Sequence, residues 1–182
     1  MVKLRDIATI QTGVFAKSAF TPNALYFQQS DFDDYGVFKN IIQPSISVDN
    51  TKHLLNEGDL LLASKGSNNI CVMVPKTEQN CVASPSFLVI RLHNKNDILP
   101  EYVAWYINLP IIQKALAMQS RGTSIMSISK ATLSELEIPI PLVEKQKKYI
   151  ELFELQKKEQ ELYKAIAEKR KQILDCKMLK NI

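Results

Sequence analysis

From Leu136 to Ile182 the chain reads LEIPIPLVEKQKKYIELFELQKKEQELYKAIAEKRKQILDCKMLKNI, and this stretch decides the fold. Pro139 and Pro141 end a short apolar run, and neither glycine nor proline occurs from Val143 onward. Glu, Lys, Gln and Leu dominate this last part, and all four are strong helix formers. We expect one continuous helix of about 36 residues, roughly 54 Å long. Such a helix is far longer than a domain of this size can cover.

Apolar residues recur along this predicted helix at seven- and four-residue spacings, as in an imperfect coiled coil. The seam consists of Leu155, Leu162, Ile166 and Ile173, with Tyr163 beside it, and it is interrupted by Glu159 and Lys169. One alternative is an exposed, charged helix with an ordinary apolar stripe. We favour a dimerisation or spacer helix, because its own domain cannot bury so long a stripe.

The preceding residues alternate between short β-prone runs and helical patterns. Strands are predicted at 25–27, 45–48, 60–64, 70–74, 86–92 and 136–140, and helices at 4–10 (ended by Gly13), 100–109, 111–118 and 129–133. The order indicates an α+β fold with a curved, mixed or antiparallel sheet and flanking helices. We expect one domain over residues 1–142, followed by the long coiled-coil helix over residues 143–182.

The net charge of +4 is unevenly distributed. Residues 1–143 carry twelve basic and twelve acidic residues, whereas residues 144–182 carry eleven basic and seven acidic ones. The whole basic excess therefore belongs to the predicted helix. A nucleic-acid site on the domain would need a local basic patch with the acidic residues placed elsewhere.

No pattern of a catalytic centre, cofactor site or metal site is present. The five glycines form neither a dinucleotide fingerprint nor a phosphate-binding loop, and His53 and His93 are isolated. Cys71, Cys81 and Cys176 lack a metal-ligand or disulfide pattern, which fits free thiols in a reducing cytoplasm. No run approaches the ~18 apolar residues of a membrane span. We therefore expect a cytoplasmic protein that is not an enzyme, without cofactor, metal or membrane.

A series of short motifs, in a fixed order, resembles the target-recognition repeat of type I restriction–modification specificity subunits. The motifs are LRDIA (4–8) with Gly13, YFQQSDF (26–32), LNEGDLL (55–61), SKGS (64–67), LPEYV (99–103), RGT (121–123) and LEIPIP (136–141) followed by Gln146. Together they span nearly the whole chain. The Ile-Pro-x-Pro tail before a glutamine-containing helix is the most specific of them.

This resemblance implies a protein that reads double-stranded DNA and performs no chemistry itself. The domain would read one half of a split site, and methyltransferase (M) and restriction/translocase (R) subunits would supply the reactions. The long helix would pack antiparallel against a second such helix and set the gap between half-sites. Family members usually carry two repeats and this chain carries one, so it is expected to be a half-size subunit pairing with itself or another half, a rearranged gene product, or an excised piece.

Polar and basic residues in predicted loops, together with Gln28 on a predicted strand, are the candidates for DNA contact, since base edges need donors and acceptors and phosphates need cations. These residues are Lys17, Ser18, Gln28, Lys65, Ser67, Asn68, Asn69, Arg121, Thr123 and Ser124. Each also has a structural interpretation, such as a hairpin turn at 64–69 or a connector at 121–124. Trp105, Tyr102 and Tyr106 are expected in the core.

The second hypothesis is a coiled-coil adaptor whose domain binds protein instead of DNA. The neutral charge of residues 1–143 motivates it. DNA-dependent methylation by a complex with a methyltransferase subunit separates the two hypotheses.

Overall fold

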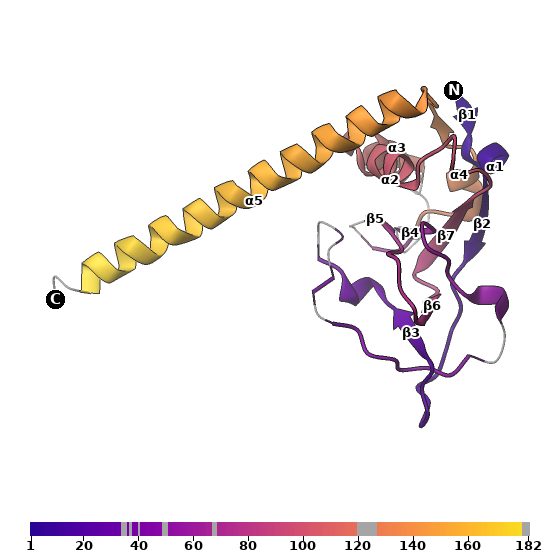
Figure 1. The fold of residues 1–182 in the computed structure, drawn as a ribbon, viewed down its shortest axis with the longest axis horizontal. Helices are drawn as coiled ribbons and strands as arrows, with labels where there is room; N and C mark the ends of the chain where they lie inside the picture. The colour runs from indigo at the N-terminus through magenta and orange to yellow at the C-terminus, as the bar shows by residue number, and fades with distance from the viewer. Residues whose placement is uncertain are drawn as a thin grey trace.

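The computed structural model describes residues 1–33, 36, 38–39, 41–48, 51–66, 69–119 and 127–179, and side chains as far as Cys176. A mixed α/β domain is followed by one helix that projects from it as an arm (Figure 1). In chain order the elements are β1 (Val2–Lys3), α1 (Leu4–Ile7), β2 (Ala8–Thr12), β3 (Ala24–Phe27), the 3₁₀ turns η1 (Gln29–Asp31) and η2 (Thr51–His53), β4 (Leu60–Ala63), β5 (Cys71–Met73), β6 (Asn80–Ala83), β7 (Phe87–Leu92), α2 (Pro100–Asn108), α3 (Pro110–Gln119), α4 (Lys130–Ser134), β8 (Glu137–Ile138) and α5 (Val143–Leu179).

A four-stranded antiparallel sheet in the order β2-β7-β4-β5 forms the centre of the domain. Strand β4 lies between β7 and β5, and all four of its residues are buried. Successive side chains of a strand point to opposite faces. Leu60 and Leu62 therefore join one core cluster, while Leu61 and Ala63 join a second one on the other face.

Helices cover the first face of this sheet. Tyr102, Val103 and Ile107 of α2 are almost completely buried against it, and Pro100 occupies the first turn of α2, where a missing N–H costs nothing. The Asn108 side chain donates to the Cys71 carbonyl (2.7 Å) and accepts from the Cys71 N–H (2.8 Å). A side-chain amide thus pairs with the outer edge of β5 as a further strand would.

The opposite face carries β3 and β6, which pair with each other in parallel. Four phenylalanine rings, Phe27, Phe32, Phe38 and Phe87, pack there with centroid separations of 4.4–6.3 Å. The central sheet is therefore buried on both faces at β4, β5 and β7, which explains why these three strands are almost uniformly apolar.

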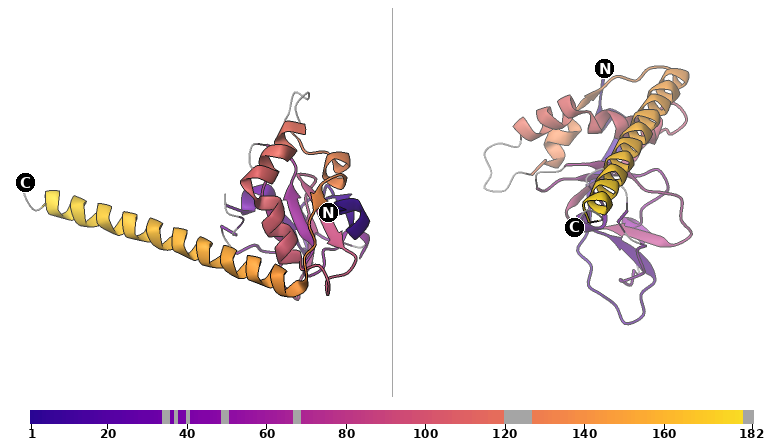
Figure 2. Two further views of the ribbon diagram at one scale, coloured as in Figure 1. Left: turned by 90° about the horizontal axis from the view of Figure 1, so that it is seen from above. Right: turned by 90° about the vertical axis from the view of Figure 1, so that its left-hand side faces the viewer.

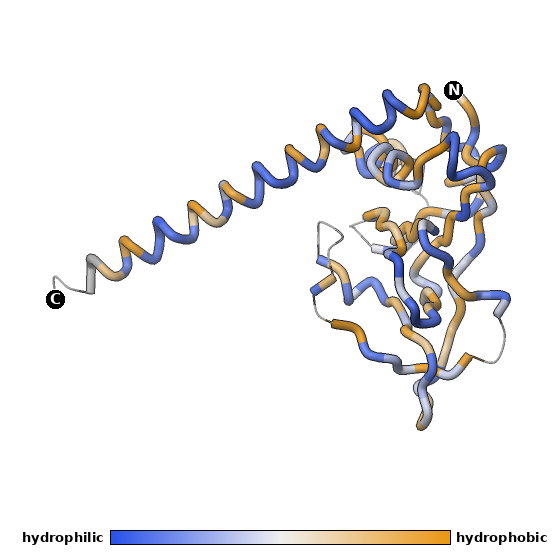
Figure 3. The backbone as a smooth tube through the Cα atoms, in the orientation of Figure 1, coloured by the Kyte–Doolittle hydropathy of each residue, from blue (hydrophilic) through white to orange (hydrophobic). Residues whose placement is uncertain are grey.

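Helix α5 leaves the domain beside α2 and extends away from it, as the two views of Figure 2 show. It follows the short pair β1–β8, in which Val2 lies opposite Ile138. Apolar and hydrophilic segments alternate along its length (Figure 3). None of the helices in the described part of the chain is long and apolar enough to cross a membrane.

The predicted α+β fold with a mixed sheet and a long final helix is confirmed. The predicted helices at 100–109 and 111–118, separated at Pro110, correspond to α2 and α3, and the turn at 129–133 corresponds to α4 with Ser129 as its N-cap. The strands at 25–27, 60–64, 70–74, 86–92 and 136–140 are present with shifted ends.

Two predicted elements in the first half of the domain are wrong. The helix predicted over 4–10 ends at Ile7, because Ala8–Thr12 pairs with β7 instead. Residues 45–48 form no strand, and Ile46 makes only isolated bridges. Strands β1 and β6 were not predicted, and β6 pairs with β3 in parallel.

Gly13 does not end a helix but allows two chain segments to pass closely. A Cβ atom there would lie 2.5 Å from the Ala83 carbonyl oxygen and closer still to that of Ser84. The Gly13 N–H donates to the Phe87 carbonyl at 3.0 Å, so the backbone cannot retreat without losing that bond. Only glycine fits where β2 crosses the end of β6.

Replacing Gly13 by alanine is expected to destabilise the chain by about 2–4 kcal/mol, because the backbone contact must open. Urea unfolding followed by the fluorescence of Trp105 measures the change. Thr12→Ala, at the exposed neighbouring position, is the control and should stay within ~0.5 kcal/mol of the original. Equal stabilities for the two variants would contradict the close approach.

Candidate nucleic-acid interface

The loop that connects β4 and β5 is a candidate contact surface. Ser64 is held by the Ser86 carbonyl (2.9 Å), Lys65 is exposed, and Gly66 adopts a left-handed backbone with φ +90°. Such a turn favours glycine because it has no Cβ. Of the predicted contact residues in this loop, Ser67 and Asn68 lie outside the described residues.

Asn69 does not lie on the surface. It is 7% exposed, and its side-chain amide donates to the Ala63 carbonyl at 2.8 Å. The amide closes the hairpin loop, so the structure assigns Asn69 to the turn and contradicts its predicted contact with a base edge.

Residues 127–128, just before α4, lie against the same hairpin. Lys65 forms an antiparallel bridge with Ser127, and the Ile128 N–H donates to the Ser64 carbonyl at 2.8 Å. The structure thus brings the residues that follow the second predicted contact loop beside the first. The predicted residues of that loop, Arg121, Thr123 and Ser124, lie outside the described part of the chain.

A third segment, around η1, reaches the same place. A Cβ at Gly66 would lie 3.8 Å from the Gln29 side-chain nitrogen, so η1 packs beside the hairpin turn. Gln28 was predicted on a strand, which is wrong: its N–H donates to the Asp31 carboxylate (2.7 Å) and it precedes the 3₁₀ turn. The Gln28 side chain is exposed, as its predicted role requires.

Lys39 adds a positive charge near this segment. Its ammonium group donates to the Ser30 carbonyl at 3.0 Å, and the residue remains exposed. Sequence reasoning missed Lys39, since a lone lysine outside any motif carries no local signal. We call the surface formed by residues 28–30, Lys39, 64–66 and 127 the hairpin surface.

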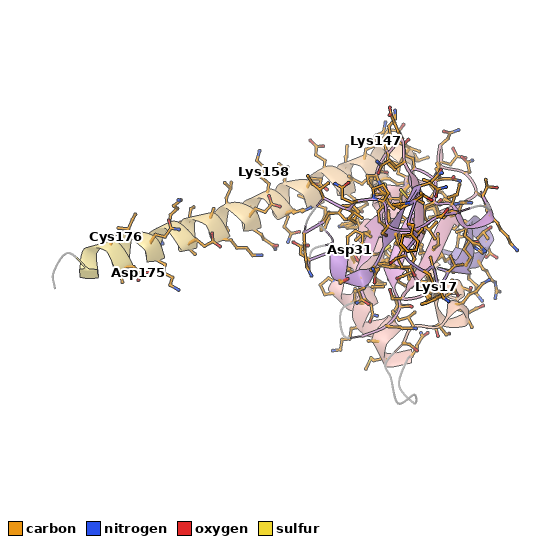
Figure 4. The ribbon with its side chains drawn as sticks, turned by 90° about the horizontal axis from the view of Figure 1, so that it is seen from below. Lys17, Asp31, Lys147, Lys158, Asp175 and Cys176 are labelled. Carbon is orange, nitrogen blue, oxygen red and sulfur yellow. The ribbon has the colours of Figure 1, made fainter. Side chains whose placement is uncertain are left out.

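Lys17 and Ser18 lie elsewhere, in the loop between β2 and β3. Both are exposed, and Ser18 forms a bridge with Ile46. Figure 4 shows Lys17 on a different part of the domain from Asp31, which belongs to η1. Phe15 and Phe20 on this loop are also largely exposed. The structure therefore does not bring Lys17 and Ser18 together with the other candidates.

The Glu-Gly-Asp motif at residues 57–59 has a structural role. Asp59 is completely buried and accepts from the Arg91 guanidinium at 2.5–3.1 Å and from the Asn56 N–H at 2.8 Å. The hydrogen bond to this carboxylate raises the pKa of Arg91. A buried carboxylate held by a guanidinium is fixed and cannot serve as a free acid or base.

The buried thiols of Cys71 and Cys81 are also unsuited to act as nucleophiles. Burial raises the pKa of Cys71 to about 12 and that of Cys81 to about 11, so neither forms a thiolate nucleophile near neutral pH. Within the described residues, no group of three or more His, Cys, Asp or Glu side chains could hold a metal ion.

The long helix is attached to the domain by Gln146, which is completely buried. Its side-chain oxygen accepts from the Leu99 N–H (2.9 Å), and its nitrogen donates to the carbonyls of Asp97 and Pro141 (2.8 Å each). One amide therefore joins the entry to α2, the linker before α5 and the first turn of α5.

Aromatic residues extend this attachment by one turn. Trp105 stacks on Tyr149 with the ring centroids 5.1 Å apart and the planes 12° apart. The buried Tyr102 hydroxyl donates to the Pro139 carbonyl at 2.8 Å. Burial raises the pKa of Tyr102 to about 12, so it remains a protonated donor. The expectation that Tyr102, Trp105 and Tyr106 belong to the core is confirmed for the two tyrosines, and Trp105 is half-buried.

Beyond Ile150 the apolar seam of α5 is open to solvent. The predicted dimerisation residues are 48–64% exposed: Leu155, Leu162, Tyr163, Ile166 and Ile173. Leu152 is exposed to a similar extent. So long an apolar stripe on an isolated helix is characteristic of a surface that binds a partner.

The fold and its surfaces define a class of protein: a loop-presenting α+β domain carried on a long helical arm. Residues 1–169 match the family described as "Type I restriction modification DNA specificity domain", and the chain belongs to this family.

Individual relatives agree with this assignment. The chain is 28% identical over 102 residues to the type I restriction enzyme MjaVIII specificity subunit of Methanocaldococcus jannaschii, covering 56% of this chain and 23% of that protein. A chain from a study of complex assembly and conformational transition of the type I R-M system has the same fold, with a TM-score of 0.67 and 20% identity over 92% of this chain and 40% of its own length. The HsdS subunit of Thermoanaerobacter tengcongensis gives a TM-score of 0.62 at 20% identity, covering 85% and 37%. The chain thus spans well under half the length of each of these relatives.

Gln146→Ala is expected to destabilise the junction between α5 and the domain by about 2–4 kcal/mol, since one N–H and two carbonyls lose their partner. The change should appear as a lower urea midpoint and as altered emission of Trp105, which stacks next to the junction. The control is Gln156→Ala, on the exposed part of the same helix. A junction that does not depend on the buried amide would give the same midpoint for both variants.

Proposed function

We propose that the chain reads one half of a bipartite double-stranded DNA sequence, as a half-size specificity subunit of a type I restriction–modification complex. In this proposal it has no catalytic activity, and methyltransferase and restriction/translocase subunits carry out the reactions in the cytoplasm. The observation that supports this proposal most strongly is the family match over residues 1–169. Separate loops that meet at the hairpin surface support it further.

The hairpin surface suits a DNA-reading role because its parts differ in chemistry. Lys65 and Lys39 supply positive charge for phosphates, and the Gln28 side chain can donate to and accept from a base edge. The proposed set also includes Ser67, Asn68, Arg121, Thr123 and Ser124 on the adjoining loops. Lys17 and Ser18 would contact DNA from a second position, and Asn69 is no longer in the set.

Bulk neutrality of the domain is compatible with this role. Two acidic residues are paired with basic ones away from this surface, Asp59 with Arg91 and Glu135 with Lys3 and Arg5, whereas the carboxylate of Asp31 in η1 accepts from the Gln28 N–H. The hydrogen bond from Lys3 lowers the pKa of Glu135, which keeps that pair ionised. Local positive charge can then act at the hairpin surface without competition from Asp59 and Glu135.

The arm supplies the second half of the proposal. A single domain reads one half-site, so two domains are needed for a split sequence. Helix α5, fixed to the domain by Gln146, would pair with the same helix of a second copy and hold the two readers apart.

The decisive experiment combines the full-length chain with the methyltransferase subunit encoded beside it and maps the methylated bases on genomic DNA. A split recognition sequence made of two related halves is the expected result. Stable assembly without any sequence preference would favour the protein-binding adaptor, and the DNA-reading proposal would be abandoned.

Lys65→Ala is expected to weaken binding to all DNA sequences alike and to reduce the slope of log K against log salt by about one. Fluorescence anisotropy with a specific and a scrambled duplex at several salt concentrations measures both effects. Lys76→Ala is the matched control, because Lys76 is exposed beyond the opposite end of β5. Equal effects of the two substitutions would place the DNA elsewhere on the domain.

A further inference from the structure

The two charged residues that interrupt the seam of α5 define how a second copy of the chain fits against it. Glu159 and Lys169 occupy the core positions of an otherwise apolar heptad pattern that begins with Leu152 and Leu155. Both face solvent in the single chain, where Lys169 only donates to Gln172 of its own helix at 3.2 Å. A partner helix that covers this seam must therefore place an opposite charge against each of these two residues.

We propose that α5 pairs with α5 of a second copy in antiparallel orientation, in the one register that places Glu159 opposite Lys169 of the second copy. This inference rests on the antiparallel pairing that the proposed function requires, and it adds the register and the two residues that determine it. The two-fold axis then passes beside Lys164, so each seam residue lies opposite the seam residue equally far on the other side of this point.

The register is consistent along the whole exposed helix. Apolar layers form between Leu162 and Ile166, between Leu155 and Ile173, and between Leu152 and Cys176 of the second copy. All of these side chains are exposed in the single chain, so the pairing covers the entire open seam. The charged pair lies between apolar layers, where an unmatched charge would be costly.

The flanking positions agree with this register. Tyr163 meets its own copy near the two-fold axis, and on the other flank Ala165 meets Ala165. Further out, Gln156 approaches Arg170, and no like charges oppose each other. The burial of Tyr163, which is 64% exposed in the single chain, explains why an aromatic residue lies beside the seam.

Other arrangements bring unfavourable contacts. A parallel pair would place Glu159 against Glu159 and Lys169 against Lys169 inside the seam. An antiparallel pair slipped by one heptad would place both charges against apolar residues or a thiol. Charge complementarity therefore selects one arrangement from the set that hydrophobic burial alone permits.

The register also fixes a distance. With the centre at residue 164, the two Gln146 anchors lie ~36 residues apart along the paired helices, or roughly 54 Å. A slip of one heptad would change this separation by about 10 Å. Glu159 and Lys169 thereby determine the spacing between the two reading domains.

Charge reversal in the full-length chain tests the pairing without DNA. Glu159→Lys or Lys169→Glu alone creates two like-charge contacts in the dimer and should weaken dimerisation at least about tenfold in sedimentation equilibrium. The double variant should dimerise like the original, and an equimolar mixture of the two single variants should form heterodimers. Glu161→Lys and Lys171→Glu, on the outer face of the same helix, are the matched controls and should leave the dimer unchanged.

Cross-linking tests orientation and register directly. Cys176 is the exposed native cysteine, whereas Cys71 and Cys81 are buried. Leu152→Cys should give a disulfide-linked dimer under mild oxidation through Cys176 of the second copy, while Glu154→Cys, off the seam, should not. The original chain should not cross-link through Cys176, because the two copies of that residue lie ~36 Å apart in this register.

A monomer at all concentrations, a Cys176–Cys176 link, or single reversals that match their controls would each overturn the inference. Circular dichroism of every variant confirms that the helix is intact, since the substituted residues are exposed and make no core contact. The outcome is separable from that of the proposed function. A split methylated sequence with a failed register would leave DNA reading in place, and the expected register without sequence preference would leave the dimer in place.

Discussion

The buried side-chain amide of Gln146 is the constraint on which the arrangement of the molecule depends. A helix of 37 residues is a rigid arm only if its first turns are fixed, because little else in the described structure touches it beyond Ile150. Gln146 satisfies the Leu99 N–H and two carbonyls at once, and no buried polar side-chain atom in the described residues is left without a partner. The stacking of Trp105 on Tyr149 one turn later fixes the rotation of the helix about its axis. The direction of the seam is thereby coupled to the direction of the hairpin surface.

The central sheet fixes the positions of the surface loops, as Gln146 fixes the position of α5. Burial on both faces leaves β4 no freedom to shift, and Asn108 closes the edge of β5. The hairpin loop between these two strands therefore starts and ends on fixed positions, with the buried Asn69 as a further tie. A binding loop on a rigid base loses less conformational entropy when it meets its ligand. This explains why buried polar side chains support a short turn whose residues Lys65 and Gly66 are exposed.

Local signals carried most of the successful predictions. Pro100 and Pro110 fix the starts of α2 and α3, and the absence of glycine and proline after Val143 fixes α5. The errors came from interactions between residues distant in sequence. Ala8–Thr12 has a helical pattern but pairs with β7, some eighty residues later. In the candidate site, the exposure of Lys65 and Gln28 could be anticipated from loop chemistry, whereas the burial of Asn69 depends on the Ala63 carbonyl across the turn. Gln146 was singled out by its motif, but its three partners are assembled only by the fold.

In the pairing that we propose, the seam of α5 favours specificity over stability. Leucine at positions 159 and 169 would bury more apolar surface, and it would also permit pairing in parallel or in slipped antiparallel registers. For an ordinary dimer, such alternatives would matter little. For the two DNA-reading domains of the proposed complex, a slip of one heptad would move the domains by about 10 Å, or roughly three base pairs of a duplex. A seam that gives up some apolar contact for one complementary charge pair per half is therefore what a spacing device requires. The same reasoning explains why the arm must be anchored by a buried amide, since a register fixed to one heptad has no value on a helix that can pivot at its base.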